Sequence, residues 1–413
     1  MTTRILLFFF LFCFLFLQAC KQESILNTEG GSYPKEIPLP KIEKNPENLT
    51  PSLPLPVSLH SNSPTAPESS LSSSTQLLSG KWVEKRDDPL SEYVKSNGYI
   101  HFQKNLELNW KVYNQGVLLP FREWLDENFK QPYKETILYP FSGPDIPNAF
   151  TIYPNAKKYI LIGLEPAGFV PALEKDKEER RNRGLKELIS SLDSISRLNF
   201  FITNKMKINI ASSVYPGTTP VFLAYLGLLG YQPLSVKPFI LNEGGDIHYL
   251  TETEIQENPN YKKGYFSVEI EFLDPKNSEN KKLIYISGNV SNQGLEKDPQ
   301  ILSFLKKNGP YSGTFKAASF LLHYDYFSIL RDFILENTDL IVMDDTGPRI
   351  KDLQKDFEIK VYGIYTRPIA LWPKMFQSEL KELHIHQSPK PIPFKYGYGT
   401  LNKTYHLIIA QKK

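Results

Sequence analysis

A short segment rich in carboxylate, hydroxyl and glycine residues, Tyr139-Pro-Phe-Ser-Gly-Pro-Asp145, directly follows a run of apolar residues. In open α/β sheets, ligands bind just beyond the carboxyl ends of the strands, so this segment is a candidate site. Gly143 permits a tight turn, and Asp145 could either cap the next helix or act as a carboxylate. The candidate residues here are Tyr139, Ser142, Gly143 and Asp145.

Glu165 ends the next apolar run, 22 residues after Gly143. That spacing fits an acid that binds ribose in a nucleotide or S-adenosylmethionine site. The match is incomplete, because the loop has one glycine, and Pro147 and Pro154 leave room for only a short helix. A structural turn, a ligand or catalytic loop and a nucleotide-like site all remain open, and no cofactor is predicted.

The pair Asp344-Asp345 follows the apolar run Leu340–Met343 and precedes Thr346-Gly-Pro. Two adjacent carboxylates at a strand end can bind a cation or separate their pKa values for acid–base catalysis. They can equally form a turn and cap a helix. Asp-Thr-Gly is also typical of aspartic proteases, but those enzymes are all-β and need two such loops. We take both residues as candidate catalytic acids and leave the metal unspecified.

Lys316, Ser319 and His323 are spaced i, i+3 and i+7 in a segment, 315–322, that is predicted to be helical. This spacing places them on one helix face, which could line a pocket or simply face water. A Ser–His–Asp hydrolase built from Ser142, His323 and one of the two aspartates is conceivable. The chain has no G-x-S-x-G segment to support it.

Two further groups of polar residues rank lower as sites. His384 and His386 alternate with no third ligand nearby, and we interpret them as surface residues. The turn Asn242-Glu-Gly-Gly-Asp-Ile-His248 carries side chains that could bind a metal.

The elements that would position these residues alternate between strand and helix patterns. Expected strands cover 136–139, 159–164, 264–272, 283–287, 340–343, 359–365 and 405–410. Expected helices cover 106–129, 174–198, 220–229 and 315–337. Such interleaving predicts a three-layer α/β fold with a mainly parallel, Rossmann-like central sheet and added antiparallel strands.

The N-terminus has the pattern of a bacterial lipoprotein signal peptide. One cation, Arg4, precedes an apolar run of 13 residues, Ile5–Leu17, and the segment ends in Ala19-Cys20. A bilayer-spanning helix needs roughly 20 apolar residues, which argues against a transmembrane anchor. Cys20 is therefore predicted to be lipidated and to attach the protein to a membrane outside the cytoplasm. Lys21, rather than an aspartate, follows the cysteine, which favours the outer membrane.

Composition narrows the remaining possibilities. The only cysteines are Cys13 and Cys20, so a mature chain would have no disulfide, cysteine nucleophile or thiolate metal site. With 48 basic and 45 acidic side chains, the chain offers no electrostatic surface for nucleic acid. Residues 20–79 are rich in proline and serine and are expected to form a disordered tether. Residues 80–413 are expected to form a single domain after a signal peptide at 1–19.

Several of these segments together resemble a family of uncharacterised bacterial proteins, many of them exported. The resemblance rests on Ile137–Gly168, which contains YPFSGPD and GLEP, on Ile341–Gly347, where the family has DDSG and this chain has DDTG, and on Tyr362–Tyr365. It covers about 106–410. The family has no established activity, so the resemblance groups the candidate residues without assigning their roles.

The expected function is therefore that of a membrane-anchored lipoprotein with a binding or structural role at the cell envelope, toward a ligand or protein partner that the sequence does not identify. The alternative is an envelope hydrolase or transferase that uses the strand-end carboxylates with His323 or Lys316. The two hypotheses differ in geometry, because only the enzyme requires Asp145, Glu165, His323 and Asp345 to converge.

Overall fold

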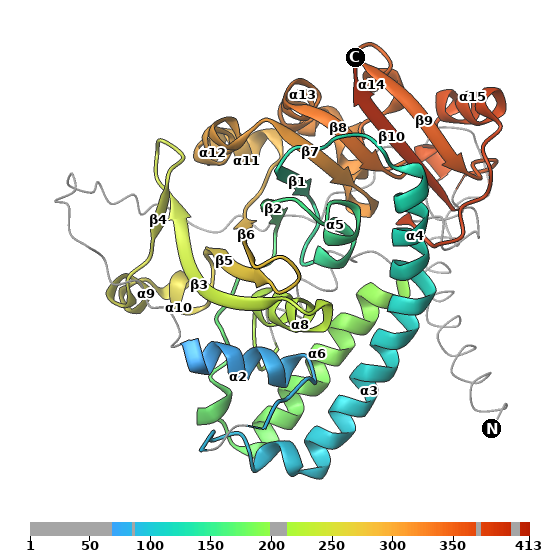
Figure 1. The fold of residues 1–413 in the computed structure, drawn as a ribbon. Helices are drawn as coiled ribbons and strands as arrows, with labels where there is room; N and C mark the ends of the chain where they lie inside the picture. Colours follow the sequence, from blue (N-terminus) through green and yellow to red (C-terminus); the bar gives the residue numbers. More distant parts are fainter. Residues whose placement is uncertain (1–67, 85–86, 199–212, 369–372, 398–404) are drawn as a thin grey trace, which may run out of the picture. The chain divides into compact units, whose positions relative to one another are not determined.

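One mixed sheet of ten strands organises the domain (Figure 1). The computed structural model describes residues 68–84, 87–198, 213–368, 373–397 and 405–413. The strands are β1 (Thr136–Pro140), β2 (Lys158–Gly163), β3 (Gln232–Leu241), β4 (Ile247–Tyr249), β5 (Ser267–Asp274), β6 (Glu279–Ser287), β7 (Tyr311–Phe315), β8 (Thr338–Met343), β9 (Phe357–Gly363) and β10 (His406–Lys412). Their order across the sheet is β4-β3-β5-β6-β2-β1-β7-β8-β10-β9.

Five neighbouring strands, β6-β2-β1-β7-β8, are parallel. Numbered in chain order, they run 3-2-1-4-5, which is the order of a doubly wound nucleotide-binding sheet. The hairpin strands β3, β4 and β5 extend one edge in antiparallel fashion, and β10 runs antiparallel between β8 and β9 at the other. The predicted α/β fold is confirmed: its central strands are parallel, as expected for a Rossmann-like sheet, and antiparallel strands are added at both edges.

Helices cover both faces of the sheet because the strands alternate their apolar side chains between two cores. One face packs on α2 (Glu68–Leu78), α3 (Asn97–Tyr113), α4 (Leu119–Asn128), α5 (Ile146–Ile152), α6 (Glu178–Leu198) and α8 (Thr219–Leu229). The other packs on α11 (Asn292–Lys297), α12 (Gln300–Asn308), α13 (Ser328–Asn337), α14 (Ile350–Leu353) and α15 (Ser378–Gln387). In β2, Tyr159 and Leu161 face the first core, and Ile160 and Ile162 face the second.

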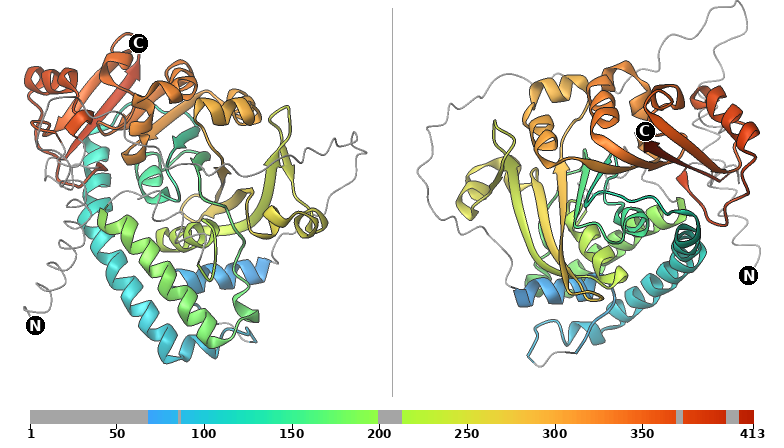
Figure 2. Two further views of the ribbon diagram at one scale, coloured as in Figure 1. Left: turned by 180° about the vertical axis from the view of Figure 1, so that it is seen from behind. Right: turned by 45° about the horizontal axis from the view of Figure 1, so that its top comes forward.

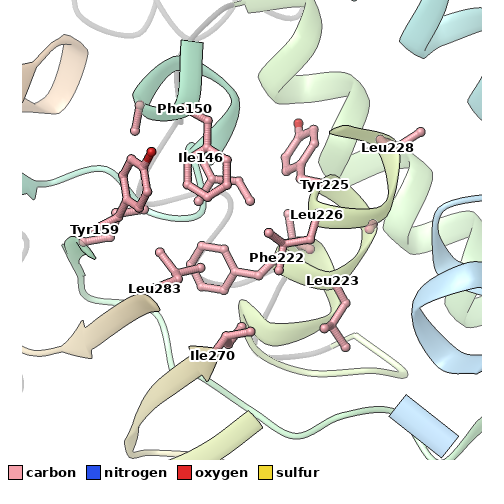
Figure 3. Close-up of a cluster of buried hydrophobic side chains, with 14 of the residues drawn as sticks. Ile146, Phe150, Tyr159, Phe222, Leu223, Tyr225, Leu226, Leu228, Ile270 and Leu283 are labelled. Carbon is pink, nitrogen blue, oxygen red and sulfur yellow. The ribbon is translucent and has the colours of Figure 1, made fainter. Parts of the chain in front are cut away.

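The first core is dense in aromatic residues where α5 and α8 meet the sheet (Figure 3). The Phe150 ring lies 4.3 Å from Tyr159 and 5.4 Å from Phe272, centroid to centroid. Helix α8 is buried on nearly all sides, and it begins with Pro220 in its first turn and ends at Gly230 in the left-handed conformation.

Shorter elements complete the domain. They are η1 (Tyr93–Lys95), a π-helical turn η2 (Asn114–Leu118), η3 (Leu173–Lys175), α9 (Glu252–Glu257), α10 (Pro259–Lys262), η4 (Ala317–His323), η5 (Asp325–Phe327) and η6 (Pro373–Met375). The expected helix at 106–129 is thus α3, η2 and α4 in succession, and it begins earlier, at Asn97, where Ser96 caps it. The views in Figure 2 show α3 and α6 side by side.

The tether prediction is wrong over residues 68–78. Helix α2 lies there, and Leu71, Leu77 and Leu78 are fully buried in the first core, beside α8. The segment was expected to be disordered because it is rich in serine. The spacing of its three leucines, however, lets all three lie on one face of a helix. All described elements belong to one compact unit, residues 60–413. The signal peptide and the tether up to residue 67 lie outside the described residues, as does Cys20.

No helix within the described ranges is both long enough and apolar enough to cross a membrane.

Candidate functional site at the carboxyl edge of the sheet

The loops that follow β1 and β7 bring a lysine and an aspartate together inside the domain. Nζ of Lys316 lies 2.9 Å from Oδ2 of Asp145, and both side chains are almost fully buried, at 1% and 2% exposed. Burial lowers the pKa of Lys316, and the nearby Asp145 carboxylate opposes that shift. The strand order reverses between β1 and β7, so this ion pair lies at the point where doubly wound sheets bind ligands.

Asp145 is held by neutral donors as well. The Tyr139 hydroxyl donates to Oδ2 at 2.8 Å, and Nδ2 of Asn148 donates to Oδ1 at 2.8 Å. Although Asp145 occupies the N-cap position of α5, its side chain makes no capping hydrogen bond. Asp145 was expected either to cap the helix or to act as a carboxylate, and the structure supports the second role.

Asp344, at the end of β8, adds a third charged group to this cluster. Its Oδ1 accepts hydrogen bonds from the backbone and the hydroxyl of Thr346, whereas its Oδ2 has no hydrogen-bond partner among the described residues. Burial, followed by repulsion from Asp345, raises the pKa of Asp344 to about 6. A carboxyl group with a pKa near neutrality and an open acceptor atom is suited to proton transfer.

We call Tyr139, Asp145, Asn148, Lys316 and Asp344 the polar cluster. Thr314 and Tyr396, which the sequence did not indicate as candidates, border the polar cluster. The Tyr396 ring lies 5.6 Å from Nζ of Lys316, and its hydroxyl is 3.2 Å from Oγ1 of Thr314. Nothing in the spacing of Tyr396 could have indicated this contact, since it follows β9 and α15 in the chain.

Asp345 secures the loop after β8, mainly through its backbone. Its backbone N–H donates to Nε2 of His406 at 3.0 Å, so this nitrogen acts as an acceptor. The 3.4 Å separation between Nε2 and Oδ1 of Asp345 is therefore a polar contact rather than an ion pair. The backbone oxygen of Asp345 accepts from Nε2 of Gln377. Asp345 is thus placed to hold the loop, β10 and the start of α15 together.

The backbone is strained on both sides of the ion pair. Phe141, just after β1, has φ of 59°, and Ala317, just after β7, has φ of 58°. Residues with a Cβ adopt this left-handed conformation at a cost of about 1–3 kcal/mol, and such residues concentrate at functional sites.

A cavity opens beside the polar cluster, along the ends of four parallel strands. Its volume is about 60 Å3, and it is lined by residues at or just beyond the ends of β1, β2, β6 and β7. We call it the apolar cavity, and its lining includes Gly143, Glu165, Gly288–Val290, Ala318 and Phe327. The Glu165 side chain is buried, and the Tyr285 hydroxyl lies 3.0 Å from its backbone oxygen and 3.2 Å from Oε2.

The proposed stripe of Lys316, Ser319 and His323 does not exist as predicted. The segment forms strand β7 and then the 3-10 helix η4, so the α-helical spacing does not apply. Ser319 is fully buried and bonds back to the Lys316 carbonyl, while Nε2 of His323 contacts the Gly347 carbonyl at 2.8 Å. Burial lowers the pKa of His323.

The Ser–His–Asp arrangement is not assembled either. Oγ of Ser142 donates to the neighbouring Gly143 carbonyl at 2.9 Å, whereas His323 binds Gly347. The surface assignment of His384 is wrong, since this residue is buried and its Nδ1 contacts the Leu380 carbonyl. His386 is exposed, as predicted.

Asp145, Lys316 and Asp344 therefore converge, and Glu165 and Gly143 line the adjoining cavity. His323, at the end of η4, contacts Gly347 instead. Within the part of the chain that the structure describes, no three His, Cys, Asp or Glu side chains are placed to hold a metal ion.

Comparison of the chain with protein-family models, curated proteins and solved structures finds no match.

Proposed function

We propose that the domain binds a neutral or cationic ligand of the nucleoside class in the apolar cavity. The observation that carries this proposal is the position of the cavity. It lies along the carboxyl ends of four neighbouring parallel strands in the 3-2-1-4-5 order, where doubly wound sheets bind their ligands.

The lining supports this ligand class. Mostly apolar walls suit a flat base, and the Glu165 carboxylate follows β2, at the position from which an acid accepts hydrogen bonds from ribose hydroxyl groups. A phosphate is disfavoured, because Pro144 and the Asp145 carboxylate precede α5 where a phosphate-binding loop would present backbone N–H groups. S-adenosylmethionine, whose sulfonium, ammonium and carboxylate groups give it a net charge of +1, satisfies these constraints, whereas ATP does not. This proposal departs from the sequence-based expectation, in which no cofactor was predicted.

The test is a binding measurement by titration calorimetry with adenosine, S-adenosylmethionine and ATP. We expect adenosine or S-adenosylmethionine to bind and ATP to bind more weakly than either. Glu165→Gln should abolish binding, while Glu257→Gln, an equal change at an exposed position of α9, should leave it unaltered. Preference for ATP, or binding that survives in Glu165→Gln, would contradict the proposal.

A transferase activity is the second candidate, and the polar cluster favours it. Burial lowers the pKa of Lys316 and raises that of Asp344 to about 6, so the two pKa values lie closer together than in water, as a candidate acid–base pair requires. If Asp344 belongs to the same site, S-adenosylmethionine should bind more tightly above about pH 6, where this carboxylate is ionised. Asp344→Asn should remove that pH dependence, and Asp356→Asn, at an exposed position, should retain it. An unchanged pH dependence in Asp344→Asn would exclude Asp344 from the site.

We also propose that the protein is a lipid-anchored component of the bacterial envelope, on the evidence of Met1–Cys20 alone. Two or three acyl chains on Cys20 would give stable attachment, and the outer membrane is the favoured destination. The ligand would then have to be available outside the cytoplasm. Intact mass spectrometry of the membrane-extracted protein, beside Cys20→Ala, tests this. Retention of Met1–Ala19 or an unmodified Cys20 would refute the anchor without affecting the ligand proposal.

A further inference from the structure

A second cavity is lined by other residues of η4 than those that line the apolar cavity. Its volume is about 340 Å3, and it lies between η4, the start of α14 and the segment that leads into α15. We call it the basic cavity. Its lining residues are Phe320, His323, Tyr324, Arg349, Lys351, Lys374, Met375, Phe376, Gln377 and Glu379. The proposed function uses none of them.

The charge on this lining is unbalanced. Arg349, Lys351 and Lys374 face one acidic lining residue, Glu379. The Arg349 guanidinium is held by Asp352, at 2.7 Å from Nε and 3.1 Å from Nη2, which fixes its position. Lys351 and Lys374 are exposed, and neither forms an ion pair with any described residue. Neither of these two exposed cations is paired with Glu379, the acidic residue of the lining.

The first turn of α15 adds a directional preference for anions. Gln377 stands at the N-cap, but its side chain does not cap the helix, because Oε1 accepts from Ile350 N–H and Nε2 donates to the Asp345 carbonyl. The first N–H groups of α15 therefore lack a side-chain acceptor at a wall of the cavity. Helix N-termini favour anions through these N–H groups and through the helix dipole.

Aromatic side chains provide the remaining walls. Phe320 and Tyr324 meet edge to face, with centroids 6.3 Å apart, and Phe376 stacks on Tyr365 at 4.9 Å. An inorganic anion would leave these rings exposed to water, whereas an anion attached to an apolar or aromatic body would cover them.

We propose that the basic cavity binds a phosphate monoester that carries an apolar or aromatic group. Lys351 and Lys374 supply flexible point charges, and α15 supplies backbone donors, which together suit a dianionic phosphate. The same chemistry is offered by a soluble phosphate ester and by the headgroup of an anionic phospholipid. This site is separate from the proposed nucleoside site, and the failure of one proposal leaves the other standing.

The test uses the full-length chain with Cys20→Ala and measures binding of phenyl phosphate, phenol and inorganic phosphate by calorimetry. We expect phenyl phosphate to bind most tightly and to weaken as NaCl is raised. Lys351→Gln with Lys374→Gln should weaken it at least tenfold. Lys355→Gln with Lys381→Gln removes the same charge from exposed positions nearby, and should change affinity less than twofold.

Binding to lipid vesicles distinguishes a phospholipid headgroup from a soluble phosphate ester as the ligand. Co-sedimentation with phosphatidic acid vesicles beyond that with phosphatidylcholine vesicles, lost in the Lys351/Lys374 variant, would assign the cavity to a lipid headgroup. Equal sedimentation with both, together with binding of phenyl phosphate, would assign it to a soluble ester. Equal affinity for phenol and phenyl phosphate, or equal affinity of the two double variants, would overturn the proposal. Circular dichroism of both variants checks that they fold.

Discussion

Two buried lysine–aspartate pairs stabilise opposite ends of the sheet. Lys316 and Asp145 meet at the carboxyl edge, with Nζ and Oδ2 2.9 Å apart, and Lys281 and Asp274 meet in the β5–β6 hairpin, with the same atoms 3.1 Å apart. All four side chains are at most 8% exposed. In side-chain burial and in the distance between the charged atoms, the two pairs are nearly the same.

Their surroundings differ. Lys281 also donates to the Pro154 carbonyl at 2.6 Å, and Asp274 also accepts from Lys276 N–H, so this pair closes a hairpin and joins it to the segment that follows α5. Lys316 and Asp145 lie instead beside Asp344, which has an open acceptor atom, and next to two strained backbone positions. A buried ion pair does not by itself mark a functional site, because it can serve stability alone. The extra carboxylate is what distinguishes the carboxyl edge.

The largest effect is expected from removal of one aspartate in each pair. Asp145→Ala and Asp274→Ala each leave a buried ammonium group uncompensated, which typically costs about 3–5 kcal/mol of folding stability. Asp145→Ala should cost more, since it also removes the acceptor of Tyr139 and Asn148. Urea unfolding of both variants measures the difference. A greater loss in Asp274→Ala would show that the hairpin pair is the more important for stability.

The next effect concerns Asp344, which has no counterpart in the hairpin. Its pKa of about 6 in the folded protein exceeds the ordinary value of 3.8, so its ionisation opposes folding. The stability that the protonated group contributes is present below about pH 4 and is lost as pH rises through 6. The stability of Asp344→Asn relative to the wild type should therefore increase by about 2–3 kcal/mol between pH 4 and pH 8.

Unfolding curves at the two pH values test this prediction, with Asp356→Asn as the control for loss of an exposed carboxylate. A constant difference between Asp344→Asn and the wild type would mean that Asp344 ionises normally, and the acid–base hypothesis would lose its support.

The smallest effects on stability are expected from replacing two tyrosines, one beside each ion pair. The Tyr139 hydroxyl donates to the Asp145 carboxylate, so Tyr139→Phe should cost about 1.5–3 kcal/mol. The Tyr231 ring lies 5.9 Å from Nζ of Lys281, and its hydroxyl bonds to none of the described residues, so Tyr231→Phe should change stability by less than about 0.5 kcal/mol. Thermal unfolding of the two variants provides the measurement. Equal losses would indicate that the hydroxyl of Tyr139 is not the important contact.

The loops around the site were predictable because strand-end positions can be identified from a sequence. Apolar runs before Asp145, Glu165 and Asp344 predicted three parallel strands, and parallel strands place their carboxyl ends on one edge. That Lys316 would join them was suggested for the wrong reason, since it follows strand β7 rather than lying on a helix face. The strand was missed because Tyr311-Ser-Gly-Thr-Phe315 is short and contains a glycine.

Contacts between residues that are distant in the chain could not be predicted from the sequence. Nothing in the local sequence relates Tyr396 to Lys316, or His406 to Asp345, because tertiary packing alone brings them together. The same holds for β3, whose Pro233 and Pro238 argue against a strand, although β3 pairs with β5 on one side and for part of its length with β4 on the other. Helix α2 was missed because composition was given more weight than the spacing of its three leucines.

The position of β10 has a consequence for how the chain must fold. It is the last strand in the sequence, yet it lies between β8 and β9 and is hydrogen-bonded to both. Likewise, β1 cannot pair with β7 until some 170 further residues have been made. Pairing over such long sequence separations makes folding slow, and a ribosome-bound chain that ends near residue 400 would leave β8 and β9 without the strand that joins them. Because these strands pair late, a chain with this topology that is exported unfolded would have time to cross a membrane before its sheet is complete.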